Sequence, residues 1–507
     1  MRTHQGGVRA VEVNPNHAPT TVTLEYSPMT GEARFPQAVW EQLRATLLAD
    51  LSRETKCFVL CRTLESSGRV VFLAREVVPV PEEAYAQRSA SLVETRPEFI
   101  HALLVRCARE GYALLEAHTH PWTTLPRFSS VDNRSDLQKF QTTQPMSPPF
   151  RHGSLVFGCD MSFEGRFWDY TREAMATITR LQVLETPPRT LYGTDCQPPD
   201  WARTALAVYD RQVRAFGLEG QAMLSHLRVA VVGAGGLGSQ IANALALLGV
   251  GHLLLIDPDR LELSNLNRVV GASYAQAVRG WRKVRALAQR LNRARPPERR
   301  TVAPLPLDVR TREALAHLLS CDLIVGAVDS AVARQYLNTV AMCALIPYLD
   351  AGVGVRSENG RLAQGGGQVQ VVIPGATACL ACTERGIRQS VEEQLTPHQR
   401  ELSIRGGYIQ GEAIPNPQVV FLNGVVGNLL VWELVKLATH CAPVQPYIYY
   451  DLLGQHAFPA RAERNPNCLL CAAHPDSLLG QGLYGLMGYL TPRRAPKSKP
   501  IPTPRGG

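Results

Sequence analysis

The second half of the chain alternates short apolar runs with helical segments. The apolar runs are LRVAVVG, HLLLID, CDLIVGAVD and IPYLDAGV, each of strand length and rich in β-branched and other apolar residues. Strands that alternate with helices predict a parallel sheet covered by helices. A longer apolar stretch, NGVVGNLLVWELVKLATH, predicts a buried helix, and YIYYD predicts a late strand. We therefore expect an α/β fold with a mostly parallel sheet in residues 206–475.

The first half mixes helix and sheet without that regular alternation. An amphipathic stretch, PQAVWEQLRATLLADLSRE, precedes the strand-like runs KCFVLCRTL and GRVVFLAREVVPVP, and a helical segment follows near Glu98–Glu110. The stretch GYALLEAHTH predicts a buried strand that ends in a loop, and SLVFGCDMSFEGRFWDY predicts further strand. These elements predict an α+β domain over residues 21–185.

Polar and proline-rich segments mark the boundaries of these two parts. Residues 1–20 are polar and predict a flexible leader. The proline-rich stretch ETPPRTLYGTDCQPPDW predicts a linker over residues 186–205. Residues 476–507 are basic and rich in proline, which is typical of a solvated tail.

Composition narrows the class of protein. The chain has 507 residues, 45% of them hydrophobic and 19% charged, which are ordinary values for a soluble protein with several cores. We find no uninterrupted apolar run of membrane length and no signal-peptide core, so we expect a cytoplasmic location and no membrane contact. The net charge of +9 comes partly from the tail, where basic and aromatic residues do not interleave. Nucleic acid is therefore a disfavoured partner.

Two histidines and an aspartate suggest a metal site in the first half. His118 and His120 are alternate residues at the end of a strand, so their side chains point the same way. Asp132 could supply a third ligand, and a zinc ion with three protein ligands keeps an open position for water. For a His-x-His pair alone, two surface histidines would be the simpler explanation.

The full spacing is more specific. His-x-His-Pro, seven residues, Ser, two residues and Asp resembles the JAMM motif of the JAB/MPN metallopeptidases. The resemblance implies a JAB/MPN α+β domain in which His118, His120 and Asp132 hold a catalytic Zn²⁺ and Ser129 steadies the oxyanion. It also implies an upstream glutamate as general base in the hydrolysis of an amide or isopeptide bond. Glu54 in SRETKCFVL fits that place and Glu76 is the alternative, because Lys-Cys replaces the family's usual Gly-Gly.

A glycine-rich loop follows the first strand of the second half. Gly233, Gly235, Gly236 and Gly238 come directly after LRVAVV and open a helix, an arrangement that lets backbone N–H groups approach a phosphate. Asp257 ends the next strand, where a carboxylate can bind ribose hydroxyls. Taken alone, these residues fit an NAD-dependent dehydrogenase equally well.

The segments that follow the loop resemble the ThiF/MoeB-type enzymes of the ubiquitin-activating superfamily. The matching segments are VYDRQVRAFG, DPDRLELSNLNRVV, RGWRKVRALAQRLN and VGAVDSAVARQYLN. The resemblance implies a Rossmann-like adenylation domain that uses ATP. It implies that Asn265, Arg268 and Lys283 bind the nucleotide, that Asp329 binds Mg²⁺, and that Arg211 reaches the nucleotide across a homodimer interface in this domain. Val269 departs from the family, which commonly has Gln there.

Four of the twelve cysteines form two Cys-x-x-Cys pairs. Four thiolates suit a closed tetrahedral zinc site, so Cys379, Cys382, Cys468 and Cys471 predict a structural Zn²⁺ and, with the histidine site, two Zn²⁺ per chain. Many members of the superfamily carry a thioester-forming cysteine in the loop after the first pair. Here that loop has none, and Cys441 lies too late in the pattern. We expect an acyl-adenylate that is passed on without a cysteine thioester.

Together the two resemblances imply a bifunctional enzyme. It would adenylate the C-terminal glycine of a ubiquitin-like protein and cleave peptide or isopeptide bonds at the same modifier, with a ubiquitin-conjugating enzyme as a further candidate partner. Two alternatives stay open besides the dehydrogenase. One is an activator of a sulfur-carrier protein for cofactor or amino-acid biosynthesis, and the other is a binding scaffold with an inactive peptidase domain. The terminal Gly506 and Gly507 also resemble a modifier's own end, which would permit self-attachment.

Overall fold

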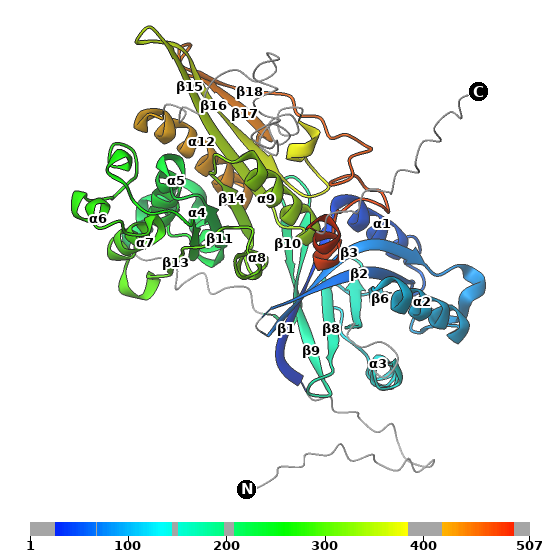
Figure 1. Ribbon diagram of the computed structural model, residues 1–507. Coiled ribbons are helices and arrows are strands. Elements are labelled where there is room, and N and C mark those ends of the chain that lie inside the picture. Colours follow the sequence, from blue (N-terminus) through cyan, green and yellow to red (C-terminus); the bar gives the residue numbers. More distant parts are fainter. Residues whose placement is uncertain (1–25, 67, 144–150, 197–206, 384–417, 491–507) are drawn as a thin grey trace, which may run out of the picture.

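The computed structural model describes residues 26–66, 68–143, 151–196, 207–383 and 418–490. Two eight-stranded sheets organise these residues, with a two-stranded ribbon beside the first (Figure 1). The fold is therefore mixed α/β, as the alternation of apolar runs predicted. The leader, residues 197–205 of the predicted linker, the loop after the first cysteine pair and Gly506–Gly507 lie outside the described residues.

The N-terminal sheet closes on itself. Its strand order is β1-β3-β2-β6-β7-β8-β9-β10, and β1 pairs in parallel with both β3 and β9. The strands are β1 Tyr26–Pro36, β2 Lys56–Ser66, β3 Arg69–Pro79, β6 Ala113–His120, β7 Gly153–Gly158, β8 Phe163–Asp169, β9 Ala174–Leu184 and β10 Arg189–Tyr192, with the ribbon β4 Tyr85–Arg88 and β5 Val93–Thr95. The helices are α1 Gln37–Leu47, α2 Pro97–Glu110 and α3 Ser130–Thr143.

Amphipathic helices cover the two faces of this sheet. Helix α1 buries Trp40, Leu43 and Leu47, whose spacing places them on one helical face. They join one apolar core with strand residues such as Phe157. Helix α2 buries Leu103 in a second core on the other face. The carboxyl end of β6, which carries the two histidines, lies at the edge of this second face.

The C-terminal sheet is parallel in its first five strands and antiparallel in its last three. Its order is β13-β12-β11-β14-β15-β16-β17-β18. The strands are β11 Arg228–Val232, β12 His252–Ile256, β13 Val302–Leu305, β14 Leu323–Gly326, β15 Tyr348–Glu358, β16 Arg361–Val372, β17 Tyr447–Asp451 and β18 His456–Pro459. The helices are α4 Asp210–His226, α5 Gly236–Leu247, α6 Tyr274–Val278, α7 Lys283–Arg293, α8 Arg312–Leu319, α9 Ala331–Ala344, α12 Val420–Thr439 and α13 Gly482–Leu490. The chain direction of the connections changes between β11 and β14, and such a switch point opens a crevice at the strands' carboxyl ends.

Helix α12 is the apolar stretch expected to be buried. Within the described residues it is the one helix long and apolar enough to cross a membrane by length and composition. In this fold 61% of its most apolar window is buried, and the helix packs on α4, α5, β15 and β16. Its apolar character is thus used for packing against the C-terminal sheet.

The two sheets share one continuous interface. Leu64, Leu73 and Leu184 of the N-terminal part belong to the same apolar core as the strands of the C-terminal part. Arg34, 1% exposed, donates a hydrogen bond to the carbonyl of Ala344 at 3.0 Å. Both apolar packing and buried charge therefore hold the halves together.

Two segments differ from the predicted boundaries. Strand β10, inside the predicted linker, pairs with β9 and extends the N-terminal sheet. Helix α13 and the residues before it, inside the predicted tail, dock on both halves: Arg75 donates to the carbonyl of Leu479, and the Gly480 N–H donates to the carbonyl of Met342 at 2.9 Å. The prediction of a solvated tail rested on the prolines and basic residues of this segment. It did not account for the apolar side chains, of which Leu486 is 1% exposed.

A buried carboxylate at the interface gives a prediction for acid stability. Glu32 accepts from Arg180 at 2.6 Å and from Arg34 at 3.0 Å, and it also pairs with Arg69. Burial alone would raise the pKa of Glu32, but the three guanidinium groups outweigh it and hold the pKa below the ordinary value. We expect Glu32→Gln to lower the free energy of unfolding by about 3 kcal/mol at pH 7, because Arg34 loses its buried partner.

The pH dependence checks the cause of that effect. A carboxyl whose pKa is depressed by folding stabilises the protein above its unfolded pKa of ~4.3, and that contribution is lost as the pH falls below this value. The difference in free energy of unfolding between wild type and Glu32→Gln, measured by chemical denaturation, should therefore become smaller under acid conditions. The matched control is Glu358→Gln, which removes an exposed pair with Arg356 and should change stability little. A difference in free energy of unfolding that stays constant with pH would contradict the conclusion that the ionised carboxylate of Glu32 causes the effect.

Candidate functional sites

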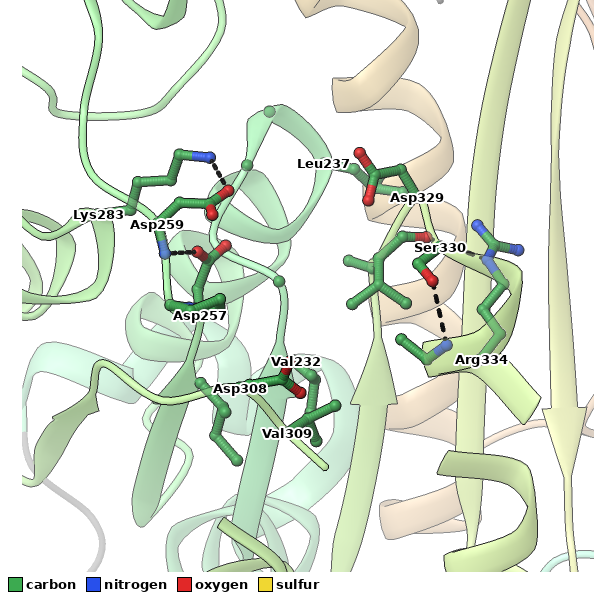
Figure 2. Close-up of a pocket in the computed structure, with 18 of the residues that line it drawn as sticks. Val232, Leu237, Asp257, Asp259, Lys283, Asp308, Val309, Asp329, Ser330 and Arg334 are labelled. Carbon is green, nitrogen blue, oxygen red and sulfur yellow. Dashed lines mark hydrogen bonds and ion pairs between the residues drawn. The ribbon is translucent and has the colours of Figure 1, made fainter. Parts of the chain in front are cut away.

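A cavity of ≈ 270 Å³ lies at the switch point of the C-terminal sheet (Figure 2). It is bounded on one side by the glycine-rich loop and on the other by the segment after β14. The polar or glycine residues that line it are Gly233, Gly235, Gly236, Asp257, Asp259, Lys283, Asp308, Arg310, Asp329, Ser330, Arg334, Gly352 and Gln418. The predicted loop and the predicted metal-binding aspartate therefore face one another across a single pocket.

The loop glycines serve close backbone approach. Gly233 has φ +93°, a left-handed conformation that favours glycine, and a Cβ there would lie 2.5 Å from the carbonyl oxygen of Ala327. A Cβ on Gly238 would lie 1.8 Å from the carbonyl oxygen of Gly233, so Gly238 lets α5 begin directly after the strand. Helix α5 begins at Gly236, which places its N-terminus at the pocket. A helix N-terminus with exposed N–H groups favours a phosphate.

Charged groups on the loop side are already paired with one another. Asp257, 7% exposed, accepts hydrogen bonds from the N–H groups of Ala234 and Asp259 at 2.7 and 2.8 Å. Burial raises the pKa of Asp257 above its ordinary value. Lys283 forms a 2.7 Å ion pair with Asp259 at the pocket wall. The ammonium group of Lys283 thus lies at the pocket wall. A bound phosphate could replace Asp259 as the partner of this ammonium group.

The opposite wall is built from the start of α9. Asp329 is exposed and follows β14, and Ser330 caps α9 by accepting from the Ala333 N–H at 3.3 Å. Arg334 donates to Asp350 at 2.8 Å and to the backbone carbonyl of Val328 at 3.0 Å. Figure 2 shows the carboxylate of Asp329 turned toward the loop side, with Ser330 behind it and the guanidinium of Arg334 farther from the loop. This wall offers an oxygen ligand beside an oriented guanidinium.

Four of the predicted nucleotide residues do not line the cavity. Gly238 acts through packing, and Asn265 is buried and bonds to the N–H of Glu262 in a capping box. Arg268 lies next to the loop, since a Cβ on Gly236 would be 3.2 Å from its Cδ, but it bonds to Ser264 and Asn267. Arg211 is exposed on α4. A single chain does not test its predicted role across a dimer interface.

Several pocket residues were missed by the sequence reasoning. Asp259 lies within the segment DPDRLELSNLNRVV, and its spacing of two residues from Asp257 is the local signal that could have indicated it. Asp308 and Arg310 line the pocket as an ion pair at 2.7 Å, from a connection between β13 and α8 that carries no recognised motif. No local signal marks these two residues, because only the fold brings their loop to the pocket.

The four paired cysteines converge as predicted. Their sulfur atoms lie within 4.8 Å of one another, with Cys379–Cys382 at 3.8 Å, Cys379–Cys468 at 3.7 Å and Cys382–Cys471 at 3.4 Å. Tetrahedral zinc with Zn–S bonds of ~2.3 Å requires sulfur–sulfur separations of about 3.8 Å. The donor set therefore fits a closed Zn²⁺ site. It joins the segment after β16 to the segment that leads into α13.

Comparison with known proteins decides the family of this half of the chain. A model of the ThiF family matches residues 209–470. The chain belongs to the ThiF family. The α/β half is thus a ThiF-type adenylation domain, a domain for which ATP is the expected nucleotide. The match excludes the N-terminal sheet and the two histidines.

Similar proteins share this domain. Ubiquitin-like modifier-activating enzyme 5 of Aedes aegypti is 27% identical over 253 residues, which are 47% of this chain and 57% of that enzyme. Molybdopterin-synthase adenylyltransferase of Escherichia coli K12 is 30% identical over 268 residues, 52% of this chain and 95% of that protein. The chain thus spans less than two thirds of the length of the first of these relatives. A crystal structure of E. coli MccB with succinimide has a TM-score of 0.43 and 20% identity, over 54% of this chain and 76% of that one.

The three predicted metal ligands outside the ThiF domain also converge. Nε2 of His118 and of His120 lie 3.4 and 3.8 Å from the two carboxylate oxygens of Asp132. Tetrahedral zinc with bonds of ~2.1 Å would require ligand separations of about 3.4 Å. Both ring nitrogens of His118 are buried without a hydrogen-bond partner, and burial lowers the pKa of His118 to about 4. A neutral imidazole with unpartnered nitrogens is the form that binds a metal, so the residues fit Zn²⁺.

The glutamate beside this cluster is Glu54. Its Oε1 lies 3.7 Å from Nε2 of His120, and its residue is 4% exposed. Burial, with Asp132 adding a smaller effect, raises the pKa of Glu54 to about 8. The alternative, Glu76, is instead held by Arg106 through two bonds of 2.9 and 2.7 Å at the surface. Of the two candidate glutamates, Glu54 is therefore the one that lies beside the cluster.

Ser129 has a different contact from the one expected. Its Oγ accepts from the N–H of Asp132 at 3.1 Å, while its own N–H donates to the Asp132 carboxylate at 2.7 Å. This reciprocal pair fixes the carboxylate of Asp132, the third predicted metal ligand, at the start of α3. Because Oγ is the acceptor, the hydroxyl hydrogen can still be donated to an oxyanion. Ser129 thus lies at the cluster, and its predicted role stays a prediction.

Loss of one cysteine should release the predicted structural metal. We expect Cys468→Ser to remove about one equivalent of zinc and to lower the melting temperature by several degrees, because structural zinc contributes directly to folding. Metal analysis and thermal unfolding measure the two effects. Cys441→Ser is the matched control, since Cys441 is exposed and lies outside the cluster. Unchanged zinc content in Cys468→Ser would contradict the site.

Proposed function

We propose that the ThiF domain adenylates the C-terminal carboxylate of a small ubiquitin-like or sulfur-carrier protein with ATP. The observation that carries the proposal is the pocket in which the glycine-rich loop, Lys283 and Asp329 surround one cavity. The names of the relatives support the class of substrate: one is called an activating enzyme for a ubiquitin-like modifier and the other a molybdopterin-synthase adenylyltransferase. A dehydrogenase transfers hydride and breaks no phosphate bond, so it needs no cation to stabilise negative charge that spreads over a phosphate during the reaction.

The pocket residues divide the work of this reaction. The phosphates lie against the N-terminus of α5 and the ribose hydroxyls bind Asp257. A carboxylate oxygen of the partner bonds to the α-phosphorus while the bond to pyrophosphate breaks. Lys283 leaves Asp259 for the phosphates and stabilises the negative charge as it spreads. Asp329 would hold Mg²⁺, which neutralises pyrophosphate when bound.

The acyl-adenylate is then passed on without a cysteine thioester. The loop that carries this cysteine in many relatives corresponds to residues outside the described part of the chain, and its sequence contains no cysteine. Cys441 is exposed but follows α12. We propose a homodimer through the adenylation domain, in which Arg211 and Arg268 complete the nucleotide site, and a cytoplasmic location. A ubiquitin-conjugating enzyme is the candidate acceptor.

We propose a second activity, hydrolysis of a peptide or isopeptide bond at the same modifier, for a JAB/MPN-type domain over residues 21–185. The convergence of His118, His120, Asp132 and Glu54 favours it over an inactive scaffold. A Zn²⁺ ion bound there would lower the pKa of water and polarise a carbonyl. Glu54 takes a proton from the water and gives it to the leaving amine, so that a C–O bond forms as the C–N bond breaks. The hydroxyl of Ser129 donates to the oxyanion.

One experiment tests both activities on the same partners. Candidate ubiquitin-like and sulfur-carrier proteins that end in glycine are offered to the full chain, and ATP–pyrophosphate exchange is measured. The same proteins with a short extension after the glycine are assayed for cleavage. Exchange that requires the exposed glycine, and cleavage at that glycine, would support the proposal. Absence of exchange with every such protein would remove the first activity, and absence of cleavage the second.

A further inference from the structure

A buried cluster of charges lies beside the predicted metal ligands. Lys139 of α3 contacts both carboxylate oxygens of Glu116 at 2.9 and 2.8 Å, and Lys56 contacts Glu116 at 2.7 Å. The side chains of Lys56 and Glu116 are 8% and 11% exposed, and that of Lys139 is 29% exposed. This cluster, which we call the lysine–glutamate clamp, plays no part in the proposed proton transfers.

The clamp takes one residue from each of β2, β6 and α3, the elements that follow or carry the site residues. Lys56 lies at the start of β2, two positions after Glu54, and it is directly opposite His118 in the pairing of β2 with β6. Glu116 alternates with His118 along β6, so it projects from the same face. Lys139 lies two turns beyond Asp132 on α3, on the same side of that helix. The contacts of the clamp therefore connect the segments that hold the proposed general base, the two histidines and the third ligand.

Few side chains of helix α3 are buried, so a small number of contacts hold the helix in position. Among residues 130–140 of this helix only Asp136 and Phe140 are buried. Asp136 accepts from Arg166 at 2.9 and 2.7 Å, and Phe140 stacks on Trp168. Arg166 also donates to Asn133 at 2.5 Å, and Leu137 packs against the small apolar cluster that contains Phe140, so both charged and apolar contacts attach α3. Displacement of α3 would move Asp132 away from the histidines.

We infer that Lys139 and Glu116 are positioning residues that set the affinity of the histidine–aspartate site for zinc by holding α3 against β6. The inference rests on the proposed peptidase site. Residues that orient metal ligands from behind typically change metal affinity about 10- to 100-fold when they are replaced. Lys139→Met should therefore weaken zinc binding at this site by about tenfold or more. Lys139→Arg, which keeps the cation, should restore most of the affinity.

The sign of the effect separates position from local charge. A lysine near a dication repels it, so removal of Lys139 would by Coulomb's law alone tighten zinc binding. Weaker binding in Lys139→Met is expected only if the helix moves. Glu116→Gln, which keeps the side-chain shape, should also weaken binding because both lysines lose their partner.

The experiment uses the full chain with its cysteine site filled. Zinc affinity is measured by competition with a chromophoric chelator, and Co²⁺ spectra distinguish nitrogen and oxygen ligands from the thiolate site. The matched control is Lys436→Met, which removes the buried Lys436–Glu433 pair at 2.6 Å in the ThiF domain and should leave this affinity within about twofold. Melting temperature and ATP–pyrophosphate exchange check that each variant is folded.

The outcomes separate the inference from the function on which it rests. A wild-type chain that binds no metal outside the cysteine site would overturn the proposed peptidase. A wild-type chain that binds the metal, with Lys139→Met and Glu116→Gln binding it equally well or more tightly, would overturn only the clamp. Should Lys139→Met fail to fold, Lys139→Gln decides in the same way, because it also removes the cation, whereas weaker binding in Glu116→Gln is expected from charge alone. Weakened binding in the variants, with rescue by arginine, supports the inference.

Discussion

Replacement of Asp329 by alanine is expected to lower ATP–pyrophosphate exchange by about a hundredfold or more. Asp329 is the exposed carboxylate of the pocket wall that faces the glycine-rich loop (Figure 2). Removing a preorganised group that stabilises transition-state charge typically costs 10²–10³ in rate. If Asp329 binds the magnesium ion, the residual activity should also require a higher concentration of free Mg²⁺. Exchange assays across a magnesium series measure both effects.

A second carboxylate of the same pocket provides the control. Asp308 also lines the cavity, but it is paired with Arg310 and lies on the loop after β13. Asp308→Ala should reduce exchange less than Asp329→Ala and leave the magnesium requirement unchanged. Equal losses in the two variants, with no change in magnesium dependence, would show that the effect comes from the negative charge of the pocket in general and not from a metal ligand.

The nucleotide pocket was predictable where its residues belong to continuous motifs. The glycine loop, Asp257, Lys283 and Asp329 each follow a strand or begin a helix, and parallel strands bring their carboxyl ends to one edge. Asp308 and Arg310 were not predictable, because their loop reaches the pocket through the order of strands in the sheet. The role predicted for Arg211 would require a second chain, so neither the sequence nor one subunit decides it.

The cluster of His118, His120 and Asp132 shows more clearly that local spacing does not predict contacts between distant segments. The local spacing identified both histidines and Asp132. The choice between Glu54 and Glu76 depended on how β2, β3 and β6 pair, and the pairing brings the end of β6 beside Glu54 while Arg106 retains Glu76. The clamp was not predicted at all, because Lys139 belongs to a polar segment without the apolar period that signals a helix.

Long-range pairing also explains the missed parts of the fold. Strand β1 pairs in parallel with β3 and β9, so its place is fixed by strands far away in the sequence. Helix α13 is short, and it packs against α9 of the ThiF domain and β2 of the N-terminal sheet. Apolar periodicity predicts elements that bury a face locally. It does not predict segments that become buried between two domains.

Replacement of Glu54 by glutamine is expected to reduce cleavage of an extended modifier by 10²- to 10⁴-fold, the usual contribution of a positioned acid–base group. Glutamine keeps the shape of the side chain but cannot accept and return the proton. Because Glu54 is not one of the three converging ligands, zinc content should stay at the wild-type value. His118→Ala, in contrast, should lose both cleavage and the metal. Cleavage of a modifier with a short extension after its glycine, together with metal analysis, measures these effects.

Two controls decide between the glutamates and between the domains. Glu76→Gln should retain cleavage, because Glu76 is held at the surface by Arg106. Glu54→Gln should retain ATP–pyrophosphate exchange, because the pocket for that reaction lies wholly in residues 232–418. Loss of cleavage in Glu76→Gln and not in Glu54→Gln would reverse the assignment of the base. Loss of both activities in Glu54→Gln would instead mean that the two domains depend on each other. The effect of the substitution would then have to pass between the domains through the shared apolar core and the buried charges of Glu32 and Arg34.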